Sequence, residues 1–286
     1  MKNFHGFVFI VLSFVLFSCS KANTSDVEYS TALDLSEEFL QIGNLHNEGV
    51  DYAYREIRSH YSETKDNGSE VLSKNELLEI ALAALYDYCG NVLPLPYDTR
   101  TTDDVNGNQT IDAEIEVYFE RIKTFFAENP EMSSSELIDE LNAVNNMALV
   151  QLSDTSKIHA VFSGTATCYS SYNYWKENHK KWIIALNYPE LLDEYTDEEL
   201  NALVPGEYGF VLPWTKSKIS ELWQKVKDTV SDWWNNGGKE IVYADGRGAA
   251  IGAMAGAMVG GAGAGPGAVA GGASASISEA IDQWKK

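Results

Sequence analysis

Basic residues are scarce in this sequence. It has 21 lysines and arginines against 42 acids in 286 residues, which gives a net charge of −21 at pH 7. Proteins that bind nucleic acid need a basic surface to neutralise phosphates. The charge therefore predicts no nucleic-acid partner. The length leaves room for one large domain or two small ones.

Cysteine is also scarce. Three cysteines, Cys19, Cys89 and Cys168, are too few for a disulfide scaffold. No CxxC or HxxxH spacing joins cysteines and histidines, so the sequence predicts no metal site. Cys89 and Cys168 are separated by 168 − 89 = 79 positions, and this spacing leaves open whether they form a disulfide.

The common catalytic motifs are missing. The sequence contains no GxSxG, HExxH or GxxxxGK[ST] pattern. Acidic runs such as 197–199 are typical of solvated helix faces rather than of acid/base pairs. The sequence therefore predicts a non-catalytic protein that needs no cofactor.

Long apolar runs are absent except near the N-terminus. Lys2 precedes an apolar stretch over 7–17, which ends in Leu16-Phe17-Ser18-Cys19. An ordinary signal peptide and an uncleaved anchor are the alternatives, but a run of eleven residues, with Ser13 its one polar residue, is short for a membrane span of about 20. The segment 16–19 looks like a lipobox, the signal for lipoprotein processing, and favours acylation of Cys19. We therefore predict a signal peptide over 1–18 and a polar tether over 19–32.

The middle of the chain predicts an acidic helical domain over 33–210. Apolar residues recur at helical spacing, and alternation with a period of two is rare, so the fold class is mostly α. Capping boxes at Ser73/Glu76 and Ser133/Glu136 mark two helix starts. Trp175 is expected to lie in the core of this bundle.

A tryptophan-rich amphipathic helix is expected over 211–243. All seven tryptophans lie in the second part of the chain, and Trp223 and Trp233 share an apolar face with lysine flanks, next to Trp234. Such a helix can lie in a membrane interface or pack on the bundle, and the sequence leaves both open.

The region 244–286 is rich in glycine and alanine. From Gly248 to Ser278, 31 residues carry no charge and ten are glycine. Four glycines recur at every fourth position and so share one helix face: Gly248, Gly252, Gly256 and Gly260. This face, called the glycine zipper below, has no side chains and therefore lets another backbone approach closely. The pattern predicts a helical hairpin around the Gly/Pro segment 260–267.

Isolated in water, this tail would be disordered, because each glycine costs a helix about 1 kcal/mol relative to alanine. Lipid, a second copy or the chain's own bundle must therefore order it. A helix of a dozen residues is about 18 Å long and does not cross a hydrocarbon core of about 30 Å. One kinked span, partial insertion and oligomerisation all remain compatible with the sequence.

Together these features resemble a group of uncharacterised lipoproteins of Bacteroidota. The resemblance rests on the lipobox, the acidic helical body, the segment 43–49, the Tyr/Trp-rich segment 169–182 and Ala244-Asp245 before the zipper. It implies no established activity. Within this group, acids after the lipidated cysteine often mark export to the surface, and Ser20-Lys21-Ala22-Asn23 is not acidic. The resemblance therefore implies a periplasm-facing anchor in the outer membrane.

Two functions remain open at this stage. In the first, the protein is an envelope lipoprotein whose zipper associates with membrane lipid or with a second copy. In the second, it is an antagonistic, bacteriocin-like protein whose tail permeabilises a target membrane while the acidic body masks it.

Overall fold

A computed structural model describes residues 35–64, 72–93, 111–192, 196–197, 200, 230, 232–258 and 263–285. All of these residues belong to one compact unit, Ala32–Lys286. The predicted signal peptide, the tether and Cys19 lie outside the described residues. The same holds for most of the predicted amphipathic helix, including Trp223, and for Gly260.

The described residues form seven α-helices and no strand, which confirms the mostly α prediction. The helices are α2 (Glu37–Thr64), α3 (Lys74–Val92), α4 (Ala113–Glu128), α5 (Ser134–Gln151), α6 (Thr155–Asn187), α9 (Lys239–Met258) and α10 (Ala264–Trp284). A short 3-10 turn, η3 (Pro189–Leu191), and a π-helical turn, η4 (Trp234–Gly238), complete the described elements.

Local capping chemistry sets the start of four helices. Both predicted capping boxes form, and in each the serine hydroxyl and the glutamate carboxylate exchange hydrogen bonds with the opposite backbone N–H. Asp112 and Asp154 begin α4 and α6 by accepting a backbone N–H two residues further on, each at 2.8 Å. These caps satisfy N–H groups that a helix start leaves unpaired.

The longest helix, α6, contacts most of the others. Its 33 residues contact α2, α4, α5, α9 and α10. Small buried residues at 163–168 let several helices approach its first half, and aromatic residues fill the space around its second half.

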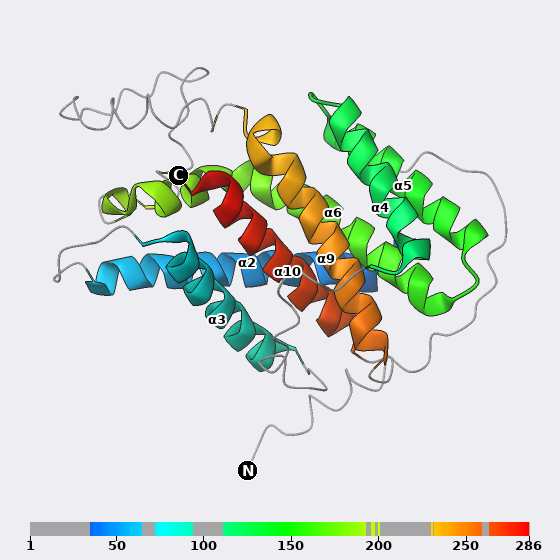
Figure 1. The fold of residues 1–286 in the computed structure, drawn as a ribbon, viewed down its shortest axis with the longest axis horizontal. Helices are drawn as coiled ribbons and strands as arrows, with labels where there is room; N and C mark the ends of the chain where they lie inside the picture. The colour runs from blue at the N-terminus through cyan, green and yellow to red at the C-terminus, as the bar shows by residue number, and fades with distance from the viewer. Residues whose placement is uncertain are drawn as a thin grey trace, which may run out of the picture. The chain divides into compact units, whose positions relative to one another are not determined.

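The predicted helical hairpin is present, and it lies inside the bundle. Its second helix begins at Ala264, inside the segment 260–267 expected as the turn, because proline is tolerated in the first turn of a helix. Helices α9 and α10 run side by side (Figure 1). Helix α10 also contacts α2, α3 and α6, while α9 contacts α6 and α4. The described residues of the ranges 33–210, 211–243 and 244–286 therefore share one core.

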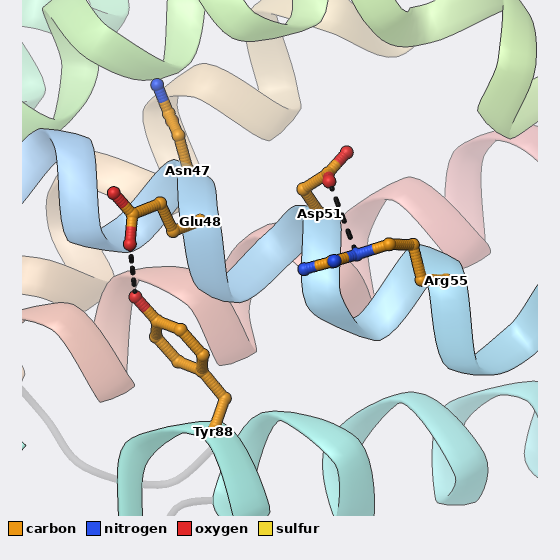
Figure 2. Close-up of a pocket in the computed structure, with 5 residues that line it drawn as sticks. All are labelled: Asn47, Glu48, Asp51, Arg55 and Tyr88. Atoms are coloured by element: carbon orange, nitrogen blue, oxygen red, sulfur yellow. Dashed lines mark hydrogen bonds and ion pairs between the residues drawn. The ribbon is translucent and has the colours of Figure 1, made fainter. Parts of the chain in front are cut away.

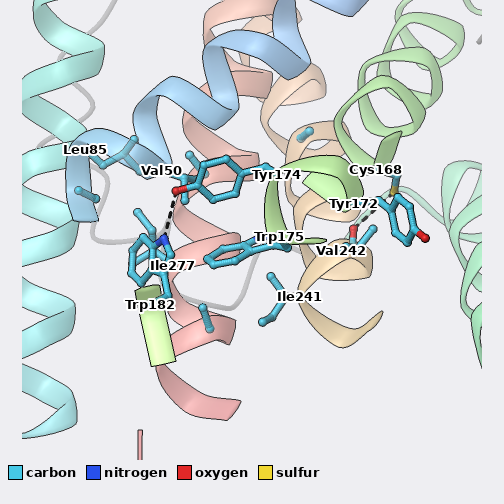
Figure 3. Packing of buried hydrophobic residues seen from close by; sticks show 14 of the residues in the cluster. Val50, Leu85, Cys168, Tyr172, Tyr174, Trp175, Trp182, Ile241, Val242 and Ile277 are labelled. Atoms are coloured by element: carbon cyan, nitrogen blue, oxygen red, sulfur yellow. Dashed lines mark hydrogen bonds between the residues drawn. The ribbon is translucent and has the colours of Figure 1, made fainter. Parts of the chain in front are cut away.

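Tryptophans occupy the centre of that core. Trp175, Trp182 and Trp284 are fully buried, and the ring of Trp175 lies 5.4 Å from that of Trp182 and 5.2 Å from that of Trp284. Figure 3 shows Trp175 between α6 and the hairpin, with Tyr174 and Trp182 beside it. The expected core position of Trp175 is confirmed.

Candidate functional site

The glycine face of α9 contacts the backbone of α10 directly. A Cβ added to any of three α9 glycines would lie 2.0–2.6 Å from an α10 carbonyl oxygen or the carbonyl at its N-cap. The facing pairs are Gly248 with Gly271, Gly252 with Gly267, and Gly256 with Gly263. Of the three surroundings left open by the sequence, the chain's own bundle is the one that contacts these glycines.

A second glycine contact lies on another side of α9. A Cβ on Gly246 would lie 2.1 Å from the Cys168 sulfur and 2.8 Å from the carbonyl oxygen of Gly164. Both partners belong to α6, so α6 and α10 approach α9 closely from two directions. Side chains larger than glycine would separate these helices.

Trp233 and Trp234 pack on the bundle. The Trp233 ring stacks on His179 at 5.4 Å, and the Trp234 ring meets Phe126 edge-on at 5.1 Å. Trp234 is 7% exposed. Of the two roles left open by the sequence, packing on the bundle is the one seen for Trp233 and Trp234.

The hairpin helices α9 and α10 have 20 and 21 residues, which is longer than the dozen residues expected from the sequence. Across the part of the chain that the structure describes, no helix combines the length and the hydropathy that a membrane crossing requires.

Cys89 and Cys168 do not form the disulfide that the sequence left open. Both are buried and free. The thiol of Cys168, on α6, lies 3.5 Å from the carbonyl oxygen of Val242 on α9. Burial raises the pKa of Cys89 to about 12 and places the pKa of Cys168 well above its usual range. Because the thiolate is the reactive form, both thiols are chemically inert in the folded domain.

We expect thiol titration to confirm this assignment. An exported Cys19→Ala variant, purified without reductant, should react with no equivalent of a thiol reagent when folded and with two equivalents in denaturant. A disulfide between Cys89 and Cys168 would instead give none in denaturant. Rapid reaction in the folded state would contradict the burial of both side chains.

A buried polar cluster lies where four helices meet. Asp245 of α9 is fully buried, and one of its oxygens, Oδ2, accepts hydrogen bonds from the Ser171 hydroxyl and, at 3.2 Å, from the Trp175 indole N–H. The same indole N–H lies 3.2 Å from the Ser276 hydroxyl of α10. Burial raises the pKa of Asp245 to about 8, and hydrogen bonds from the two serines and the indole oppose that rise. The carboxyl group is therefore largely neutral at pH 7.

His46 of α2 completes this cluster. Its side chain is fully buried, and its Nε2 lies 3.7 Å from Oδ2 of Asp245. Its Nδ1 lies 2.9 Å from the Asn47 side-chain oxygen, which assigns the proton to Nδ1. Burial lowers the pKa of His46 to about 4, although the Asn47 side chain and the Gly272 backbone of α10 act to raise it, so the ring is neutral at pH 7.

A surface pocket lies over the same part of α2 (Figure 2). It measures about 440 Å³ and is lined by Asn47, Glu48, Asp51, Arg55 and Tyr88. Its charged groups pair with one another and with the bundle. Tyr88 donates to Glu48 at 2.9 Å, and Asp51 lies 3.6 Å from Arg55. The amide of Asn47 donates to a backbone carbonyl of α6 at 3.0 Å, so this pocket wall is fixed to the bundle.

The pocket residue Asp51 also forms a half-buried ion pair with the bundle. Lys181 of α6 is 7% exposed and donates to Asp51 at 2.6 Å. Its ammonium group also lies 4.6 Å from the centre of the Tyr54 ring. Together these contacts hold α2 against α6. Within the described ranges, no group of three His, Cys, Asp or Glu side chains is placed to hold a metal ion.

The sequence did not predict a role for three residues of the buried polar cluster, Asp245, Ser171 and Ser276. The signal that could have found them is a polar residue on an apolar helical stripe. Asp245 lies between Ile241 and Ala249 at four-residue spacing, and all three are buried. His46 lies between Gly43 and Gly49 on α2. Asn47 satisfies its Nδ1, but its Nε2 has no hydrogen-bond partner.

Comparisons with family models, curated proteins and solved structures found no match to this chain. The resemblance to Bacteroidota lipoproteins stays a prediction.

Proposed function

We propose that this protein is a lipid-anchored, non-catalytic protein of the bacterial cell envelope. In this proposal the acyl chains on Cys19 attach the protein to the outer membrane, on its periplasmic side. The helical domain follows the tether and acts as a compact body at the membrane surface. The lipobox sequence and the scarcity of catalytic motifs support this function.

One structural observation supports an intramolecular role for the glycine zipper. The glycine face of α9 is in backbone contact with α10 at all three described positions. Association through these glycines is therefore intramolecular, and the same face is not free for lipid or for a second copy while the domain is folded. The lipid on Cys19 then becomes the expected attachment to the membrane.

Membrane permeabilisation is the second candidate. Its supporting observation is the position of the weakly charged hairpin against α2, α3 and α6, which is what masking by the acidic body requires. In this candidate the hairpin would have to leave the bundle before it could meet lipid, which would cost the buried contacts of α9 and α10.

Fractionation of a non-lipidated variant separates the two candidates. Residues 1–18 are replaced with an ordinary cleavable signal peptide, and Cys19→Ala removes the acylation site. We expect the natural chain in the membrane fraction after a high-salt wash and the variant in the soluble periplasmic fraction. Retention of the variant in washed membranes, together with leakage of dye-loaded vesicles, would overturn the proposal and favour permeabilisation.

A further inference from the structure

We propose that His46 and Asp245 form a buried binding site for one proton that fastens the glycine hairpin to α2. This inference goes beyond the proposed function, because it concerns the interior of the domain and holds wherever the protein is attached.

The first argument is geometric. His46 and Asp245 are both 0% exposed, and the pair bridges α2 and α9. Two atoms of the pair, Nε2 of His46 and Oδ1 of Asp245, have no hydrogen-bond partner. Buried polar atoms without partners are rare, and each one points to a missing proton, water or ion. A shift of about 0.9 Å would shorten the 3.7 Å separation to an ordinary hydrogen bond.

The second argument concerns which atom can donate. Because the Nδ1 proton of His46 is used by Asn47, Nε2 presents a lone pair towards Asp245. A carboxylate there would place two acceptors face to face, whereas a protonated carboxyl supplies the missing donor. One proton on Oδ2 of Asp245, facing Nε2, therefore supplies the donor that Nε2 lacks and leaves the pair with no net charge.

The third argument concerns the surrounding charges. Apart from His46, no basic side chain among the described residues forms an ion pair with Asp245. The carboxylate of Glu279, on α10, raises the pKa of Asp245 by charge repulsion. The Cys168 thiol, on α6, has a raised pKa and is neutral, so it adds no charge beside Asp245. From α9 itself, Arg247 points to Glu116 of α4, at 3.3 Å. Among the described residues around Asp245, no basic side chain is therefore placed to neutralise the carboxylate, and a bound proton does so instead.

The pH dependence follows from the two pKa shifts. Asp245 has a pKa raised from 3.8 to about 8, so its contribution to stability is lost as the pH rises through that interval. His46 has a pKa lowered from 6.5 to about 4, so its contribution is lost as the pH falls through its interval. Between about pH 4 and 6.5 the two residues change the stability of the domain in opposite directions as the pH rises. From about pH 6.5 to 8 only the Asp245 loss remains, and the hairpin should loosen.

Asp245→Asn tests the proposal, because the amide keeps the size of the side chain and carries a permanent donor. In the mature chain with Cys19→Ala, we expect the parent's melting temperature to fall between pH 6.5 and 8. Asp245→Asn should remove most of that fall and melt higher than the parent at pH 8. Asp139→Asn, which changes an exposed acid of α5, is the matched control and should keep the parent's slope.

Two direct measurements keep the proposal testable even if Asp245→Asn does not fold. The Asp245 carboxyl carbon, followed by NMR in the parent, should titrate with a midpoint near pH 8 rather than 3.8. Amide exchange, corrected for its intrinsic pH dependence, should lose protection in α9 and α10 above pH 7 before it does in α5. A carboxyl midpoint below pH 5, or equal pH slopes in Asp245→Asn and Asp139→Asn, would overturn the proposal.

Discussion

Gly252→Ala is expected to lower the free energy of unfolding by about 2–3 kcal/mol, near the upper end of what overpacking costs. The added Cβ would lie 2.0 Å from the carbonyl oxygen of Gly267 and 2.7 Å from its carbonyl carbon. These are backbone atoms, which no rotamer change can move away. The two helices must separate, and the contacts along the hairpin weaken together.

The sign of the change in the free energy of unfolding distinguishes close packing of the two helices from helix propensity. In an isolated helix, alanine is favoured over glycine by about 1 kcal/mol, so a free zipper face would gain stability from the substitution. Gly90→Ala is the matched control, because nothing lies within 4 Å of a Cβ at this exposed helical position of α3. Urea unfolding followed by tryptophan fluorescence measures both variants. A Gly252→Ala variant as stable as Gly90→Ala would mean that α9 and α10 are not in backbone contact.

Trp175→Ala is expected to have the largest effect of a single truncation, about 3–5 kcal/mol. Its fully buried ring contacts the rings of Tyr174, Trp182 and Trp284. Truncation leaves a cavity among these rings and also removes an N–H donor from Asp245. Because this cost is a large fraction of the stability of an ordinary domain, the variant should be partly unfolded at 37 °C.

Trp175→Phe separates the two parts of that effect. It keeps one aromatic ring in place of the two fused rings of the indole and loses the N–H group, and leaving Asp245 without that donor should cost about 1–3 kcal/mol. The indole hydrogen bond lowers the pKa of Asp245, so its loss should raise that pKa further. Denaturant unfolding and the carboxyl titration measure the two consequences. An Ala variant that costs less than the Phe variant would contradict the central position of the ring.

Local sequence signals were sufficient for much of the helical fold. The capping boxes at Ser73 and Ser133 form as predicted, because a cap depends on residues three positions apart. The four-residue glycine spacing also predicted the hairpin, since it places the glycines on one helix face whatever surrounds them. These features depend on local backbone geometry, which is why one sequence reveals them.

Features that depend on distant residues were decided by the tertiary structure alone. The glycine spacing predicts that a backbone will approach α9 but does not say whether it belongs to lipid-embedded helices, a second copy or α10. The spacing of Cys89 and Cys168 likewise does not determine their separation in space. His46 meets Asp245 across 199 positions of sequence (245 − 46) only because α2 and α9 pack in one core. That contact comes from the way several helices bury their faces together, which no local pattern encodes.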